Sequence, residues 1–455
     1  MAKLRMPLAA HWTETPVGRA AKPMQEFVHS STSGGTVLLV AAATALVVAN
    51  SPLRSAYEDL LNSYLDVKLG TFELHLSVLH WINDGLMAIF FFLVGLEIKR
   101  EVWAGELSNV RAALLPLVAA IGGAVVPALI YVGINLGGAG SAGWGIPMAT
   151  DIAFALGVLA LVGSAVPFGL KIMLTAIAII DDLIAVLVIA FFYSGSIDFG
   201  ALATGFALLA LLLVANIAGI RTIPVYLLVG LLVWAAFLAS GVHATIAGVL
   251  VALTIPVRVR IDQATFLRRA RSILDGFEVS SKQEPYSILE DEQQQAAVIE
   301  LEDLSEAVQA PLQKIEHKLH SWAAFVVIPV FALANAGVTI SVDALRDETL
   351  PVAIGIMAGL LIGKPAGLFG ATWLAVRVGL VTLPKGITWR HVAGLACLGG
   401  MGFTMSLFVA TLAFGSSQLL ETAKLGILAA SLIAGVVGFV VLRTARTTAD
   451  KTSST

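Results

Sequence analysis

Charged side chains are scarce in this sequence. Lys, Arg, Asp and Glu make up only 13% of its 455 residues, whereas 58% of the residues are hydrophobic. Soluble globular domains carry about 25% charged residues, so this scarcity excludes a soluble globular protein. It predicts an all-α polytopic membrane protein, and the 42 glycines fit this class because small residues let membrane helices approach closely.

Cysteine is nearly absent as well. The single Cys397 lies in an apolar segment, which excludes intrachain disulfides and a cysteine-rich metal site. The first apolar run, 34–49, has no small-residue cleavage site of the Ala-x-Ala kind. We therefore expect a retained first span and not a signal peptide.

Apolar runs of bilayer length fill most of the chain and predict about twelve transmembrane helices. They lie near 34–50, 79–98, 112–135, 144–162, 170–193, 199–219, 222–239, 242–256, 321–341, 350–376, 390–413 and 422–442. We thus expect a cytoplasmic N-terminal segment (1–33), a transmembrane domain (34–443) interrupted by a cytoplasmic loop (258–319), and a cytoplasmic tail (444–455).

Basic residues support this topology. If both termini are cytoplasmic, nearly all 28 Lys and Arg residues fall on the cytoplasmic side, and Lys364 falls inside a run. The exceptions on the outer side are Arg54, Lys68, Arg346 and Lys424. The positive-inside rule therefore places both termini in the cytoplasm.

Two adjacent carboxylates, Asp181 and Asp182, interrupt the apolar run 172–192. A charged side chain at the centre of the bilayer costs roughly 2.5–3.5 kcal/mol or more, so such residues are functional by default. Consecutive helical residues point about 100° apart, so one acid can face a water-filled funnel while the other faces a partner helix. We expect the pair to hold a cation or a proton.

Two of the spans are interrupted. Gly145 and Pro147 precede Thr150 and Asp151 in mid-span, and three glycines break the run 397–406. Irregular backbone at this depth survives only where it lines a cavity or is buried in protein, and paired broken helices indicate a transporter site. Asp151 could neutralise the N-terminal ends of the half-helices, and Lys364 their C-terminal ends.

Further titratable residues stand at the ends of the spans. Asp84 and Glu97 bracket the second span, and His243 lies near an outer membrane edge; each could be an ordinary interfacial residue, although histidine suits pH sensing. Glu316, His317 and His320 stand at the inner mouth of the next span without a complete metal set, so we predict no zinc.

Two extramembrane stretches carry local patterns. The segment 67–77 alternates in part, which fits either a short exposed β-hairpin around Leu69-Gly70 or an irregular loop. The 258–319 loop begins basic and becomes acidic and Gln-rich, with some helical spacing of apolar residues at 296–304. It reads as a solvated helix or flexible insert without chemistry.

Together these motifs resemble the NhaA family of bacterial sodium/proton antiporters, from about Ser30 to Arg443. The matching segments are Asn83–Met87, Leu96–Glu101, Ala149–Ala155, Ile180–Leu183, Gly241–Thr245, Phe331–Gly337, Gly363–Gly367 and Gly399–Met405. The loop 261–312 departs from the family by being longer and more acidic.

The resemblance implies inverted repeats with two broken, crossing helices, in the bacterial inner membrane. It implies an electrogenic, pH-regulated exchanger that expels Na⁺ or Li⁺ for a larger number of H⁺, without a cofactor or a nucleic-acid partner. Asp182 would bind the cation, with Asp181 as its neighbour and as the partner of Lys364. Thr150 and Asp151 would belong to the crossing.

The resemblance also extends to regulation and assembly. Glu97, Glu316 and the inner histidines would match the pH-sensing region of the family, and segment 67–77 would match its dimer hairpin.

Other classes fit less well. An intramembrane aspartyl protease places its two acids on different helices, with a Gly-x-Gly-Asp motif that is absent here. A cation channel needs a repeated pore-lining ring, which this sequence lacks. A sodium-coupled solute symporter of related fold stays open as the alternative, so a transporter and not an enzyme is expected.

Overall fold

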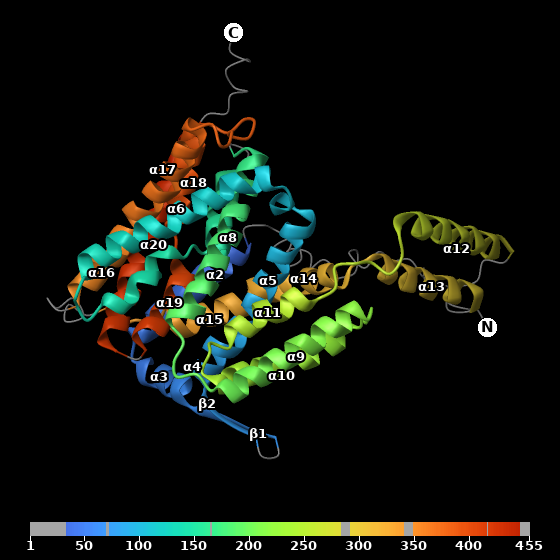
Figure 1. Cartoon of the computed structure of the whole chain (residues 1–455), viewed down its shortest axis with the longest axis horizontal. Helices are drawn as coiled ribbons and strands as arrows, with labels where there is room; N and C mark the ends of the chain where they lie inside the picture. Colours follow the sequence, from blue (N-terminus) through green and yellow to red (C-terminus); the bar gives the residue numbers. More distant parts are fainter. Residues whose placement is uncertain are drawn as a thin grey trace, which may run out of the picture.

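The computed structural model describes residues 33–69, 72–163, 166–283, 292–340, 349–415 and 417–445. Helices dominate this part of the chain (Figure 1). They are α2 (Ser33–Ala49), α3 (Arg54–Asn62), α4 (Val78–His80), η2 (Trp81–Leu86), α5 (Met87–Ala104), η3 (Glu106–Ser108), α6 (Val110–Asn135), η4 (Ser141–Met148), α7 (Ile152–Val162), α8 (Phe168–Phe192), α9 (Phe199–Ile217), α10 (Ile223–Ser240), α11 (Thr245–Thr254), α12 (Gln263–Gln283), α13 (Glu292–Val308), α14 (Pro311–Trp322), η6 (Ala323–Val327), α15 (Ile328–Asn335), α16 (Leu350–Ala358), η8 (Gly359–Gly363), α17 (Lys364–Arg377), α18 (Trp389–Gly399), α19 (Phe403–Phe414) and α20 (Gln418–Thr444).

Membrane-spanning helices confirm the predicted polytopic fold. Within the described residues, nine helices are long and apolar enough to cross a bilayer, or up to eleven if each bent pair counts as one span. The predicted count of twelve is not confirmed, because the run 242–256 folds as the ten-residue helix α11. Gly241 precedes α11 with a φ of 77°, and Pro256 follows it, so the helix is limited at both ends.

Close backbone contacts hold the bundle together. A Cβ atom added to Gly367 of α17 would lie 2.1 Å from the carbonyl oxygen of Gly122 on α6. One added to Gly248 of α11 would lie 2.3 Å from the carbonyl oxygen of Ala88 on α5. Glycine is therefore required at both crossings, as expected where small residues let membrane helices pack closely.

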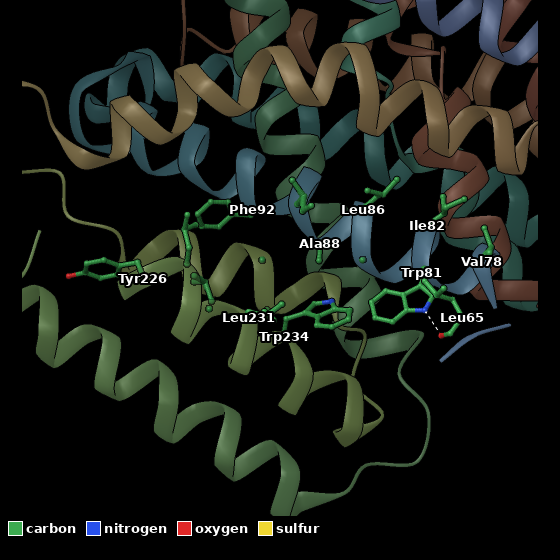
Figure 2. Close-up of a pocket in the computed structure, with 17 residues that line it drawn as sticks. Leu65, Val78, Trp81, Ile82, Leu86, Ala88, Phe92, Tyr226, Leu231 and Trp234 are labelled. Carbon is green, nitrogen blue, oxygen red and sulfur yellow. Dashed lines mark hydrogen bonds between the residues drawn. The ribbon is translucent and has the colours of Figure 1, made fainter. Parts of the chain in front are cut away.

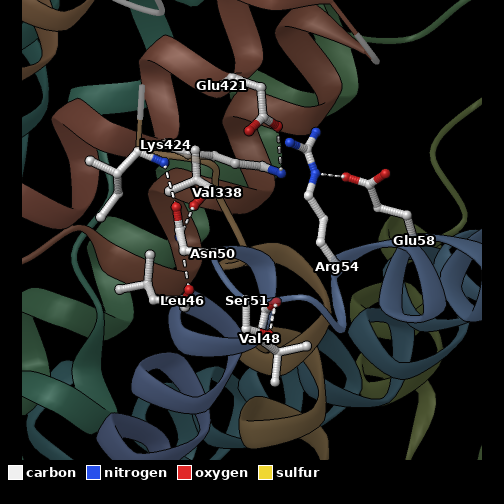
Figure 3. Close-up of polar contacts among 10 residues, drawn as sticks. Leu46, Val48, Asn50, Ser51, Arg54, Glu58, Val338, Glu421 and Lys424 are labelled. Carbon is white, nitrogen blue, oxygen red and sulfur yellow. Dashed lines mark hydrogen bonds and ion pairs between the residues drawn. The ribbon is translucent and has the colours of Figure 1, made fainter. Parts of the chain in front are cut away.

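The bend between α2 and α3 is fixed by one side chain. The two helices meet at 112°, and the Asn50 amide donates to the carbonyl oxygens of Leu46 and Val338, both at 2.8 Å (Figure 3). Nearby, Arg54 pairs with Glu58 at 2.7 Å, and Lys424 pairs with Glu421 at 3.2 Å. The bonds of Asn50, which also accepts from the Ile340 backbone N–H at 2.9 Å, tie the end of α2 to the segment that follows α15, whereas the two ion pairs lie within α3 and α20.

Three parts lie at the periphery of the bundle (Figure 1). The helices α9 and α10 run side by side and expose large apolar side chains, as spans that face lipid do. The helices α12 and α13 extend away from the bundle, and α13 covers the segment 296–304 with helical spacing.

The third peripheral part is the predicted hairpin, which is confirmed. Strands β1 (Tyr64–Leu69) and β2 (Phe72–Ser77) pair antiparallel, with Leu69 opposite Phe72, and form the only sheet in the described part of the chain. Gly70, at the predicted turn, lies outside the described residues.

Candidate functional site

Two interrupted spans meet at the centre of the site. Non-helical backbone separates η4 from α7 at 149–151 and α18 from α19 at 400–402. The Asp151 backbone N–H donates to the Met401 carbonyl at 2.7 Å, and the Thr150 hydroxyl donates to the Gly399 carbonyl at 2.9 Å. The predicted crossing of two broken helices is therefore confirmed, and each break satisfies polar backbone groups of the other.

Asp151 joins the N-terminal ends of two helices. One carboxylate oxygen accepts from the Phe154 backbone N–H of α7 at 2.9 Å. The other accepts from the Thr404 backbone N–H at 3.1 Å and from the Thr404 hydroxyl at 2.5 Å, both in α19. An acid at two helix N-termini satisfies free N–H groups and opposes the positive ends of both helix dipoles.

Lys364 lies at the C-terminal end of a helix, whereas Asp151 lies at N-terminal ends. Its side chain is fully buried, and its ammonium donates to the carbonyl of Met148, the last residue of η4. It also donates to a carboxylate oxygen of Asp181 at 2.6 Å. A π-helical turn, η8, precedes this lysine, and Pro365 follows it; such turns are frequent at functional sites.

Asp182 differs from every other acid of the crossing. Its side chain is 0% exposed, and neither carboxylate oxygen has a hydrogen-bond partner within the described residues. Asp181, its neighbour in α8, faces Lys364 instead. An unpaired buried carboxylate is strongly unfavourable, and a proton or a cation at this position would neutralise it.

A cavity lies along the same helix toward the inner mouth. It has a volume of about 630 Å³ and lies between α5, α6 and α8, with Glu101, Glu106, Lys171 and Thr175 among its lining residues. Thr175 precedes Asp182 by seven residues, so the two side chains lie on one face of α8 and about 10 Å apart along it. This cavity is the candidate inner entrance.

Charged side chains from two helices meet at the inner end. Arg100 of α5 forms ion pairs with Glu316 of α14 and, at 2.9 Å, with Glu101. His320 lies 3.8 Å from Glu97. Sequence reasoning identified Glu97 and Glu316 but missed Arg100, whose position three residues after Glu97 in α5 was the available signal.

His317 is the one predicted inner residue that the structure does not bring into this cluster. Its side chain is exposed on α14, whereas Glu316 is buried. Within the described residues, His320 and not His317 is the histidine that lies near Glu97.

Asp84 and His243 lie at the other end of the second span. His243 and His80 are neighbours of the Asp84 carboxylate. A ring nitrogen of His243 donates to the Tyr193 backbone carbonyl at 2.6 Å. Tyr193 in turn donates through its hydroxyl to the Ala142 carbonyl at 2.7 Å, which links this end to the interrupted span.

Broken helices that cross at one buried acid, beside a pair of further buried acids and a buried lysine, define a membrane transporter. Comparison with known proteins gives the family. Residues 25–442 match the family described as Na⁺/H⁺ antiporter 1, and the chain belongs to it. The predicted resemblance is thereby confirmed, as is a transporter and not an enzyme, and the ions that such proteins carry are substrates and not cofactors.

Individual relatives are similar over nearly their whole length. The protein named Na(+)/H(+) antiporter NhaA from Oleidesulfovibrio alaskensis is 48% identical over 428 residues, which cover 94% of this chain and 95% of the relative. Na(+)/H(+) antiporter NhaA 1 from Saccharophagus degradans is 48% identical over 94% of this chain and 93% of its own. Na(+)/H(+) antiporter NhaA from Sulfurimonas denitrificans is 46% identical over 96% of this chain and 98% of its own.

Proposed function

We propose that this protein expels Na⁺ or Li⁺ across the bacterial inner membrane in exchange for a larger number of protons. The observation that carries the proposal is the fully buried Asp182 carboxylate without a hydrogen-bond partner within the described residues. A proton neutralises it, as does Na⁺ or Li⁺, and only one of these can bind at a time. Exchange follows if each form opens to either side of the membrane in turn.

An excess of protons over Na⁺ requires more than one titrating group. Asp182 supplies one, and the buried pair of Asp181 and Lys364 supplies the second. All three groups share one buried site, so the exchanged protons belong to the set and not to a single residue. Net charge then crosses the membrane in each cycle, which makes the exchange electrogenic.

Regulation by pH belongs to the titratable groups at the two ends of the second span. Glu97, Glu316 and His320 serve at the inner mouth, where Arg100 already links α5 to α14, and the exposed His317 lies beside them on α14. Asp84 and His243 serve at the outer end. Each cluster joins two or more helices, so a change of charge there alters how the helices pack.

Orientation and assembly complete the proposal. Both termini lie in the cytoplasm, with segments 1–33 and 444–455 and the loop 258–319 on that side, as the distribution of basic residues favours. The transmembrane domain spans 34–443. Two copies associate through the outer hairpin 67–77.

The test uses inside-out membrane vesicles that hold a respiration-driven pH gradient, monitored with a pH-sensitive dye. Addition of NaCl should collapse the gradient with wild type and not with Asp182→Asn, which is expected to fold and insert normally. A membrane-potential dye should report charge movement in the same vesicles. Absence of collapse with wild type at any pH, or full collapse with Asp182→Asn, would contradict the proposal; sodium-coupled solute uptake would then be assayed.

A further inference from the structure

An apolar groove runs between two membrane spans, away from the crossing. It has a volume of about 580 Å³, which is within the usual range of ligand pockets, roughly 300–1,000 Å³. Figure 2 shows its lining residues in a row between the segment η2–α5 and the helices α10 and α11. None of the site residues discussed above lines it.

Every polar side-chain group in the lining already has a partner. The Trp81 indole N–H donates to the Leu65 carbonyl at 3.1 Å, and the Trp234 indole N–H donates to the Asp84 carbonyl at 3.2 Å. The Tyr226 hydroxyl donates to the Ile220 carbonyl at 2.8 Å. The remaining lining residues are aliphatic, aromatic or glycine. A polar ligand would therefore lose its hydrogen bonds to water without replacement, so the groove favours hydrocarbon.

The dimensions of the groove match one leaflet of a bilayer. Its lining on α10 extends from Tyr226 to Trp234, and its lining on η2 and α5 extends from Trp81 to Phe92. These spacings correspond to about 12 Å and about 16 Å along a helix. Half of the hydrocarbon core of a bilayer is about 15 Å thick.

The groove is also continuous with the surface that faces lipid. Ile89 and Leu231 line it and are 41% and 60% exposed. At the end nearest the hairpin, the rings of Trp81 and Trp234 lie 5.9 Å apart, and tryptophan is enriched at membrane interfaces. A lipid that enters here keeps its headgroup at the tryptophan level and its chain between the spans.

We propose that this groove binds one acyl chain of an outer-leaflet phospholipid. The bound chain fills the space between η2–α5 and α10 and so couples the peripheral pair α9–α10 to the span that carries Asp84 and Glu97. Binding of an acyl chain in this groove does not depend on which ion the protein carries, because no residue of the crossing lines the groove.

The full-length protein is reconstituted in vesicles of phosphatidylethanolamine and phosphatidylglycerol, with a small fraction of phosphatidylethanolamine that carries a diazirine in mid-chain. After irradiation, lipid adducts are mapped by peptide mass spectrometry. Adducts should be several-fold more frequent at Leu231 than at Leu228, which is 67% exposed on the same helix but outside the groove.

Gly85→Phe should reduce the Leu231 adducts to the level of Leu228. A Cβ atom at Gly85 meets only a Trp81 ring carbon at 3.7 Å, so the larger side chain can enter the groove. The matched control is Gly133→Phe on α6, where an added Cβ atom meets nothing within 4 Å and adducts should not change. If Gly85→Phe fails to fold, Leu231→Trp fills the groove from an exposed position, and adducts are then counted at Phe92.

Equal labelling of Leu231 and Leu228 in wild type would overturn the proposal. So would adducts that persist in the folded groove-filling variant. Oxidation of Leu231→Cys to a disulfide between two chains would also overturn it, with a second copy of the protein as the occupant.

Discussion

The two adjacent aspartates show how strongly a single helical position determines chemistry. Asp181 and Asp182 are both buried in α8, yet Asp181 is paired with Lys364 at 2.6 Å, and Asp182 has no partner among the described residues. The two side chains point about 100° apart around the helix axis, which accounts for the difference. One carboxylate is therefore part of the structure of the crossing, and the other is available to an ion.

This contrast predicts opposite effects on stability. Lys364→Ala should destabilise the fold by roughly 3–5 kcal/mol, the cost of removing one partner from a buried ion pair. Asp182→Asn should leave the melting temperature of the purified protein unchanged or higher, because no hydrogen bond is lost. The measurement is thermal unfolding in detergent.

Sodium adds a second readout to the same experiment. A ligand that binds only the folded state raises stability, by about 2.7 kcal/mol at 100 times its Kd. NaCl should therefore raise the melting temperature of wild type more than choline chloride does, and it should have no such effect on Asp182→Asn. A large loss of stability in Asp182→Asn without Na⁺ would mean that this carboxylate has a structural partner.

At the scale of elements, the crossing is stable because residues of each break form hydrogen bonds with free backbone groups of the other. Asp151 accepts from N–H groups of both α7 and α19, and Lys364 donates to the end of η4. Unsatisfied backbone groups in the bilayer would each cost several kcal/mol, so neither break is stable alone. The two broken spans form one structural unit.

Substitutions at the crossing should lower the stability of the fold in proportion to the hydrogen bonds that they remove. Asp151→Ala removes the cap of two helices and should cost about 2 kcal/mol or more, since each cap is worth roughly 1 kcal/mol. Thr404→Val removes one hydroxyl donor but keeps the backbone N–H, and it should cost about 1 kcal/mol.

The matched control for Thr404→Val is Thr411→Val on the same helix, where the hydroxyl donates only to the Phe408 carbonyl within α19. Melting temperatures should fall least for the control and most for Asp151→Ala. If Asp151→Ala melted like the control, the double cap would not contribute to stability.

Sequence reasoning predicted the breaks, since glycine and proline mark them, and it predicted an acid and a base beside them. The resemblance also implied that Lys364 pairs with Asp181, but nothing in the sequence predicted that Asp151 would meet Thr404, 253 residues away. The pairing of Asp151 with Thr404 depends on how two spans cross, and no local pattern encodes it. The ion pair of Arg100 with Glu316 could not be predicted for the same reason, because Glu316 comes from a distant helix.

For the whole molecule, the distribution of apolar runs was enough to predict the class of fold. The length of α11 was not predictable from hydropathy alone, because it depends on how the chain enters and leaves the bundle. The Lys99 ammonium donates to the carbonyls of Leu253 and Ile255 at the end of this helix. A cation from α5 thus stabilises a helix too short to cross the membrane.

The proposed dimer gives a prediction at this scale. Asp66 and His75 are opposite each other in the hairpin, and a ring nitrogen of His75 is hydrogen-bonded to the Asp66 carboxylate at 2.5 Å. Residues 67–74 can therefore be replaced by Asn-Gly, which favours a two-residue hairpin turn. The shortened protein keeps Ser77, which caps α4, and Leu65, which binds Trp81.

We expect the shortened protein to be monomeric, whereas wild type is dimeric. Light scattering coupled to size-exclusion chromatography, over a range of protein concentrations, measures this directly. The vesicle assay should still detect sodium-induced collapse of the pH gradient, because each chain holds its own Asp181, Asp182 and Lys364. A shortened protein that stays dimeric would place the interface elsewhere. A monomer without exchange would mean that the crossing depends on the partner chain.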